Sequence, residues 1–355
     1  MSALTISAGP TAYAQLREEG VRQEQFKVML GASGGPKWFV LYGLDRYLFS
    51  QFFANREQTL YTLGSSAGAW RLSCLATEDP LRAIDELAVR YSGQTYTDVP
   101  TIEEITAKMR DMLEHVLGPD GPAQLVHNPH IKTHLVADRC KGFGNSHRKI
   151  PQSVFLGLSA LCNIASRSTL SWFFQRTLFT NSPETSPWGE LTDIDTAIAP
   201  ISKDNLLDVL IASGSIPFVL EGVRNISGAA RGLYWDGGIT DYHFDLPFLK
   251  GDGLVLYPHF SSKVIPGWFD KRLPWRKPNP KHFHNVVLVT PSDEFVAELP
   301  NAKIPDRTDL ERYSESERLS IWQQVLDSSV QLGDEFRLLV EEGEGIDNIQ
   351  LLDAF

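Results

Sequence analysis

The sequence predicts an α/β protein with a central, mostly parallel sheet flanked by helices. Short apolar runs of strand length alternate along the chain with longer segments of helical spacing. Glycine-rich turns follow several of these runs, as expected where a buried strand passes into a helix. The chain has 355 residues, of which 42% are hydrophobic and 22% charged, so it can bury a large core. We expect one large domain over residues 1–355.

The expected strands are short and buried on both faces. In chain order they are residues 26–30, 60–63, 133–137, 233–235, 254–257 and 286–290. Helices are expected from Pro36 onward and at residues 67–76, 80–91, 206–212 and 314–342. The last of these would place Leu319, Trp322, Leu326, Val330 and Phe336 on one face, with acidic residues opposite. Since parallel strands end at one edge of a sheet, ligands would gather at that edge.

The net charge of −11 belongs to the C-terminal segment. Residues 292–355 hold 16 acidic and 5 basic residues, a net charge of −11, so the charges of residues 1–291 sum to zero. We expect this segment to be an acidic, largely helical extension packed on the main body. An acidic chain argues against non-specific binding of nucleic acid, so no nucleic-acid partner is expected.

The sequence favours a cytoplasmic location. No apolar run reaches the roughly 20 residues needed to span a bilayer. Residues 1–10 contain no basic residue and no long apolar core, which argues against a secretory signal. The three cysteines, Cys74, Cys140 and Cys162, are widely spaced, as is typical of a reducing compartment.

A serine between two glycines follows the expected strand at residues 60–63. The segment Gly64-Ser65-Ser66-Ala67-Gly68 fits Gly-x-Ser-x-Gly, the turn on which many acyl-transfer enzymes present a nucleophile. The segment 31–35 (Gly-Ala-Ser-Gly-Gly) fits the same pattern. Each match alone is also consistent with a tight strand-to-helix turn that performs no chemistry.

The residues around the two serines suggest different roles. Ser33 precedes Gly34 and Gly35, and glycines allow backbone N–H groups to approach a ligand, as an oxyanion hole requires. Ser66 precedes small residues that let a helix pack beneath a strained serine. Ser66 is therefore the better candidate nucleophile, and Gly34 and Gly35 are the better candidate donors.

A serine nucleophile needs a base, and Asp236 is the first candidate. It lies in Trp235-Asp236-Gly237-Gly238, directly after an expected strand, although an ordinary Asp-Gly turn would look the same. The glycine loop ending in Lys37, the serine motif at 64–68 and the Asp-Gly-Gly at 236–238 together resemble the patatin-like phospholipase family. The resemblance covers roughly residues 26–240, about two-thirds of the chain, and includes the small residues 213–218.

The resemblance implies a three-layer α/β/α fold and a serine acyl hydrolase of lipid or other carboxylic esters. Phospholipids or lysophospholipids would be the favoured substrates, with no cofactor. It implies Ser66 as the nucleophile, Asp236 as the base in a dyad without histidine, and Gly34 and Gly35 as oxyanion donors. Lys37 occupies the family's Arg/Lys position. The chain departs from the family by having Ser33 where the loop usually has a further glycine.

Two other functions remain open at this stage. One is a conventional Ser-His-Asp esterase that uses His243 or another of the nine histidines. The other is a non-catalytic lipid-binding or scaffold protein that retains the fold. The closely spaced histidine pairs, His282 with His284 and His127 with His130, have no further ligands nearby in the sequence, so no metal site is expected.

The segment 261–282 is basic and aromatic, with four prolines. Its net charge is +5, from six lysines and arginines and Asp270, and it includes Trp268, Phe269 and Trp275. Such a loop is consistent with peripheral contact with an anionic membrane surface. The alternative is a solvated loop whose aromatic side chains pack into the core.

Overall fold

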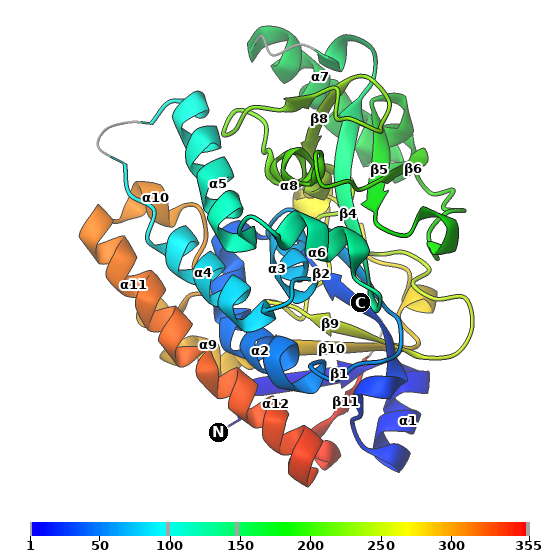
Figure 1. The fold of residues 1–355 in the computed structure, drawn as a ribbon, viewed down its shortest axis with the longest axis vertical. Helices are drawn as coiled ribbons and strands as arrows, with labels where there is room; N and C mark the ends of the chain where they lie inside the picture. The colour runs from blue at the N-terminus through cyan, green and yellow to red at the C-terminus, as the bar shows by residue number, and fades with distance from the viewer. Residues whose placement is uncertain (1, 97–99, 146–148, 353–355) are drawn as a thin grey trace.

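A mostly parallel sheet lies between layers of helices (Figure 1). The computed structural model describes residues 2–96, 100–145 and 149–352. In this part of the chain the strands are β1 (Leu4–Ala8), β2 (Phe26–Gly31), β3 (Leu60–Ser65), β4 (Ile131–Cys140), β5 (Phe174–Thr180), β6 (Thr196–Pro200), β7 (Val223–Arg224), β8 (Leu233–Asp236), β9 (Leu254–Pro258), β10 (Val286–Pro291) and β11 (Gln350–Leu351). The main sheet has the order β11–β1–β10–β9–β2–β3–β4–β5–β6, and β8 pairs with β4 and β7. The predicted fold class is confirmed.

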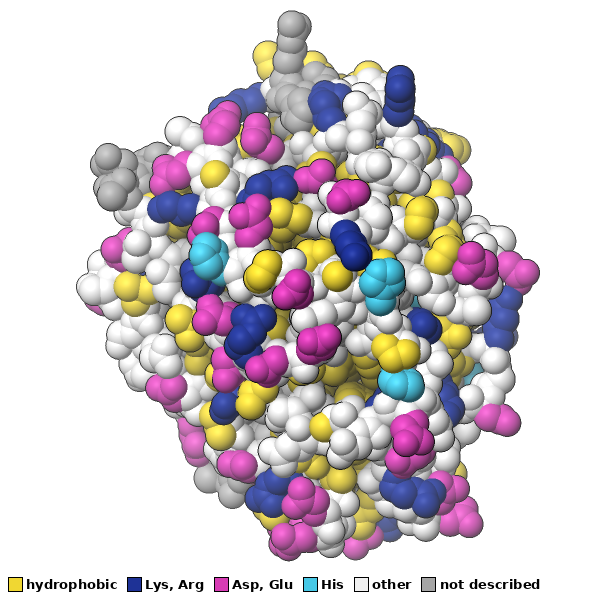
Figure 2. All heavy atoms as spheres, in the orientation of Figure 1, with side chains coloured by type: hydrophobic (Ala, Val, Ile, Leu, Met, Phe, Trp, Pro, Cys, Tyr) yellow, Lys and Arg dark blue, Asp and Glu magenta, His cyan; other side chains and the backbone are white. Residues whose placement is uncertain are grey.

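Helices connect and cover these strands. The described α-helices are α1 (Pro10–Glu19), α2 (Tyr42–Tyr47), α3 (Ala67–Leu75), α4 (Pro80–Ser92), α5 (Ile102–Leu117), α6 (Gly121–His127), α7 (Lys149–Ala165), α8 (Leu206–Gly214), α9 (Asp293–Glu298), α10 (Asp309–Arg312), α11 (Glu315–Ser328) and α12 (Val330–Glu342). Short 3-10 helices include η2 (Gly35–Leu41), η5 (Arg167–Trp172) and η8 (Trp268–Arg272). In Figure 1, α7 lies at one end of the molecule and α12 lies toward the other. In the same view, apolar side chains reach the surface near the α7 end (Figure 2).

The centre of the sheet brings the two glycine-serine turns together. β2 and β3 are parallel neighbours with Gly31 opposite Gly64, so the loops that follow them leave the sheet side by side. A methyl group at Gly68 would lie 1.9 Å from the carbonyl oxygen of Gly31. The glycine at position 68 therefore allows the first turn of α3 to pack directly on the end of β2.

The strand predicted before Asp236 is present, and it runs antiparallel to its neighbour β4. β8 is antiparallel to β4, with Asp236 opposite Ala137, whereas β3 is parallel to β4 with Ser65 opposite Val136. β3 and β8 therefore run in opposite directions, and their C-terminal ends pair with the neighbouring residues Val136 and Ala137 of β4. Asp236 therefore lies at a strand end, as predicted, but a short antiparallel strand delivers it, whereas parallel strands deliver the two glycine-serine turns.

Two helix predictions need correction. The segment after Pro36 begins as the 3-10 helix η2 and becomes α-helical only at Tyr42. Residues 314–342 form two helices, α11 and α12, which meet at Ser329. The Ser329 hydroxyl accepts a hydrogen bond from the Gly43 N–H and donates one to Leu326, and this junction leaves Val330 at the surface rather than on the buried face.

Candidate active site

Ser66 occupies a strained turn between β3 and α3. Its backbone has φ 55° and ψ −128°, a conformation that costs a non-glycine residue free energy and persists only where its surroundings hold it. The Ser66 N–H donates to the Ser213 hydroxyl over 3.0 Å, which fixes the turn from the side of α8. This strand–turn–helix geometry is the one in which serine nucleophiles are presented to substrate.

The helix that follows Ser66 is anchored on two sides. The guanidinium of Arg71 makes a bidentate ion pair with Asp45 of α2, at 2.6 and 2.7 Å, and both side chains are fully buried. The indole N–H of Trp70 donates to the Leu210 carbonyl of α8 over 2.9 Å. These contacts hold α3, and with it the Ser66 turn, in a fixed position.

Ser66 and Asp236 form a direct hydrogen bond. The Ser66 hydroxyl donates to Asp236 Oδ2 over 2.8 Å, and the Gly238 N–H donates to Asp236 Oδ1 over 2.7 Å. Both residues are only 6% exposed. Burial raises the pKa of Asp236 to about 6, against the lowering effects of the Gly238 N–H, the Ser66 hydroxyl and the cations of Arg307 and Lys271. A carboxylate with a pKa near 6 is ionised at neutral pH and basic enough to accept the serine proton.

The glycine loop after β2 lies beside this pair. Among the described residues, no protein group accepts a hydrogen bond from the N–H of Gly34 or Gly35. Gly35 has φ 57°, and a methyl group at Gly34 would lie 2.5 Å from the Phe260 ring. Both positions therefore suit glycine, and two backbone donors remain available to an oxyanion.

The second serine motif is organised differently. The Ser33 hydroxyl donates to the Ser65 hydroxyl over 2.9 Å, and the Ser33 N–H donates to the Tyr242 carbonyl over 3.0 Å. Ser33 is not among the residues with positive φ. The Ser33 hydroxyl therefore bonds to another serine hydroxyl, whereas the Ser66 hydroxyl bonds to a carboxylate that can act as a base.

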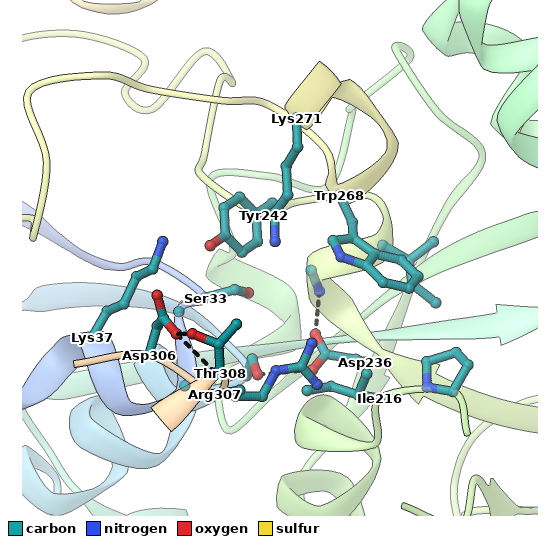
Figure 3. Close-up of a pocket in the computed structure, with 16 residues that line it drawn as sticks. Ser33, Lys37, Ile216, Asp236, Tyr242, Trp268, Lys271, Asp306, Arg307 and Thr308 are labelled. Carbon is teal, nitrogen blue, oxygen red and sulfur yellow. Dashed lines mark hydrogen bonds between the residues drawn. The ribbon is translucent and has the colours of Figure 1, made fainter. Parts of the chain in front are cut away.

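One cavity of about 230 Å³ holds all five residues named from the sequence (Figure 3). Ser66, Asp236, Gly34, Gly35 and Lys37 contribute to its wall. Further lining residues, which the sequence reasoning did not assign to the site, are Ser33, Ile216, Pro217, Gly238, Ile239, Tyr242, Trp268, Lys271, Asp306, Arg307 and Thr308. The structure thus brings the five predicted site residues together and adds residues from three distant segments.

Three of the lining side chains are cationic. Lys37 lies 5.0 Å from the Phe260 ring centroid, Lys271 lies 3.7 Å from that of Tyr242, and Arg307 faces Asp236 in Figure 3. Among the described residues, none of the three is within ion-pair distance of a carboxylate. Burial, together with the charges of Lys37 and Arg307, lowers the pKa of Lys271 to about 8. The cavity therefore has three cations around one buried carboxylate, and the half-buried Asp306 is a further acidic residue in its wall.

Sequence signals for the added residues were weak. Trp268 and Lys271 belong to the basic, aromatic segment 261–282, whose composition indicates membrane contact or a solvated loop but not a place in the site. Arg307 lies in the acidic C-terminal segment and has no local motif around it. A contact between residues this far apart along the chain leaves no mark in a single sequence.

His243 does not lie in this cavity. It lines a neighbouring one, with its ring stacked on Tyr242 at 4.3 Å between centroids. Its Nδ1 accepts the Ile265 N–H over 2.9 Å, and burial holds its pKa well below the usual range. The neutral His243 ring therefore carries its proton on Nε2. In this tautomer Nε2 cannot accept a proton from a serine hydroxyl.

The other histidines do not line this cavity either, as far as the structure describes them. His147 lies outside the described residues, and none of the rest is among the lining residues. The described residues also contain no group of three or more histidine, cysteine, aspartate or glutamate side chains that could hold a metal ion.

Comparisons with known proteins find only weak similarity to solved structures. No protein-family model matches this chain, and no curated protein matches it. Among solved structures, VipD from Legionella pneumophila is 12% identical with a TM-score of 0.36, over 99% of this chain and 75% of VipD. Human GIVD cytosolic phospholipase A2 is 12% identical with a TM-score of 0.38, over 95% of this chain and 62% of that chain, less than two-thirds of its length. Similarities of this size carry no information about individual residues.

Proposed function

We propose that this chain is a serine hydrolase of carboxylic esters that forms an acyl-enzyme on Ser66. The observation that carries the proposal is the 2.8 Å hydrogen bond from the strained Ser66 to the buried carboxylate of Asp236. Asp236 accepts the hydroxyl proton as Ser66 Oγ attacks the ester carbonyl carbon. The N–H groups of Gly34 and Gly35 stabilise the negative oxygen of the tetrahedral intermediate.

Asp236 then acts twice more in proton transfer. Collapse of the intermediate breaks the bond to the leaving alcohol, whose oxygen takes the proton from Asp236. Water gives a proton to Asp236 as its oxygen attacks the acyl carbon, and the second intermediate collapses with the proton returning to Ser66. The products are the acid and the alcohol, and the enzyme is restored.

The cavity walls favour an ester that carries an anionic group. Ile216, Pro217 and Ile239 provide an apolar wall, while Lys271 and Arg307 provide positive charge near the dyad. An amphiphilic ester with a phosphate, such as a phospholipid or lysophospholipid, matches both features. The motif resemblance to patatin-like phospholipases supports the same substrate class.

A fluorophosphonate probe tests the nucleophile. The wild-type protein should become labelled on Ser66, and Ser66→Ala should lose both labelling and ester hydrolysis. Ser33→Ala is the matched control, because Ser33 lies in the twin motif and should keep most of the activity. A wild-type protein that is not labelled would favour a non-catalytic lipid-binding or scaffold protein, and labelling on Ser33 would overturn the assignment to Ser66.

A pair of esters tests the anionic preference. The double substitution Lys271→Gln and Arg307→Gln should lower kcat/KM for a lysophospholipid about tenfold or more, and that for an uncharged monoacylglycerol much less. The comparison is between two esters on the same protein, so a general loss of activity is recognised at once. Equal losses on both substrates would contradict the role given to the two cations.

A further inference from the structure

Helix α7 exposes an apolar face. Its residues Ile150, Val154, Leu158, Leu161 and Ile164 have between 43% and 79% of their surface exposed. Their spacing of four, four, three and three residues puts them in one stripe along the helix. Helix α7 therefore presents a continuous row of large aliphatic side chains to its surroundings.

The buried face of α7 carries polar side chains. Gln152, Ser159 and Asn163 point inward beside Phe155 and Leu156, so the polarity expected of a surface helix is partly reversed. The Asn163 amide donates to Asp270 over 2.7 Å, and the Arg276 guanidinium donates to the Asn163 carbonyl over 2.6 Å. The inward face is thus fixed by specific hydrogen bonds, which sets the apolar face outward.

The surroundings of α7 are basic in a protein that is acidic overall. Residues 261–282, which pack on α7 through η8, have a net charge of +5. Residues 141–183 add five basic residues and no acidic one, although Lys141, Arg167 and Arg176 form ion pairs with aspartates outside that range. Lys149, Arg272 and Lys277 are exposed. The acidic helices α11 and α12 lie away from α7 in Figure 1, so the charge is divided between the two regions of the molecule.

The apolar face is also coupled to the cavity. The hydrogen bond between Asn163 and Asp270 joins α7 to η8, and η8 carries Trp268 and Lys271, which line the cavity. Exposed aromatic residues lie on segments packed against α7: Phe143 before it and Trp172 in η5 after it. Aromatic and aliphatic side chains flanked by cations are the combination that binds the interfacial region of anionic bilayers.

We propose that α7 docks on an anionic lipid surface, with its apolar stripe in the interface and Lys149, Arg272 and Lys277 at the headgroups. The helix would lie along the surface, and no described helix is long and apolar enough to cross a membrane. The inference goes beyond the proposed function and does not require it, because docking needs no catalysis. It predicts where lipid first meets the molecule, which is beside the segment that lines the cavity.

Vesicle co-sedimentation of the full-length protein tests the docking. The wild type should bind phosphatidylcholine vesicles that contain phosphatidylglycerol, and Leu158→Gln with Leu161→Gln should weaken binding by about tenfold for each leucine. The matched control is Val89→Gln with Val330→Gln, which replaces two exposed valines on α4 and α12 and should leave binding unchanged. Hydrolysis of a water-soluble ester by each variant reports on the dyad separately, so failure of docking and failure of catalysis are distinguishable.

A fluorescence measurement locates the contact independently of binding strength. In a Cys162→Ser background, an environment-sensitive dye on Leu161→Cys should shift to the blue on adding these vesicles, and the same dye on Val330→Cys should not. Equal binding by wild type and the double leucine variant would overturn the proposal, as would a dye at position 161 that does not respond. A wild-type dimer that the leucine substitutions convert to a monomer, with vesicle binding unchanged, would assign the face to a second copy of the chain instead.

Discussion

Replacing Asp236 with asparagine should strongly reduce catalysis and at the same time stabilise the fold. Asparagine has nearly the same shape, and its Oδ1 can still accept the Gly238 N–H that Asp236 accepts at 2.7 Å. It cannot accept a proton from Ser66. Loss of a general base lowers a rate by about 10²–10⁴, so ester hydrolysis should fall by at least about a hundredfold.

The gain in stability follows from the pKa of the buried carboxyl. Burial raises this pKa from 3.8 to about 6, so between about pH 4 and pH 6 the folded protein binds more protons than the unfolded chain. The free energy of unfolding therefore falls as the pH rises through this window. Above the window, the loss of stability caused by ionising Asp236 has reached its full size. A shift of roughly 2 pKa units corresponds to about 3 kcal/mol. For a chain of 355 residues, this is equivalent to about 4 °C in Tm.

Thermal unfolding at several pH values measures this effect. At neutral pH the Asp236→Asn variant should melt above the wild type by up to about 4 °C, and the difference should vanish toward about pH 4. A variant that melts below the wild type at neutral pH would show that Arg307 and Lys271 stabilise the carboxylate more than burial destabilises it. Normal hydrolysis by this variant would refute the dyad itself and direct attention to a histidine.

Two further predictions concern the pH profile and the anchoring of α3. For a soluble, uncharged ester, kcat/KM should fall about tenfold per pH unit below about pH 6, because Asp236 must be ionised to act as a base. Lys271→Gln removes a charge that lowers this pKa and should move the acid limb to higher pH, whereas a limb that stays in place would contradict the link. Arg71→Met leaves Asp45 buried without its partner and should cost about 3–5 kcal/mol at neutral pH, measured by urea unfolding. Burial raises the pKa of Asp45, so this variant should regain stability on acidification, and an unchanged urea midpoint would contradict the anchoring role.

Much of the fold could be predicted because its central strands are buried on both faces. β2, β3, β9 and β10 appear in the sequence as short, largely apolar runs. β5 was not predicted, because polar residues such as Arg176 interrupt its pattern. Arg176 is fully buried, paired with Asp241 at 2.6 Å and with Asp193 at 2.8 Å. A buried ion pair of this kind depends on residues that are far away in the sequence.

Helix α7 was missed for a related reason. Its apolar residues have helical spacing, but the sequence alone does not tell which face is buried. Sequence reasoning assumes that the apolar face of a helix packs inward, and in α7 the larger aliphatic side chains face outward. The direction of β8 also could not be predicted from the sequence, since a four-residue strand carries no signal for parallel or antiparallel pairing.

The candidate site has one set of contacts that holds the Ser66 turn and a separate segment that lines the rest of the cavity. The turn at Ser66 is held by Ser213, by the close approach of Gly68 to Gly31 and by the pair of Arg71 with Asp45. None of these contacts involves residues 261–308, the region that contributes Trp268, Lys271 and Arg307 to the cavity. Substitutions in that region should therefore change which ester is accepted while the hydrogen bond from Ser66 to Asp236 remains in place. Substrate selectivity and proton transfer are coupled through the charges of Lys271 and Arg307. These cations would bind an anionic substrate, and they also lower the pKa of Asp236, the base.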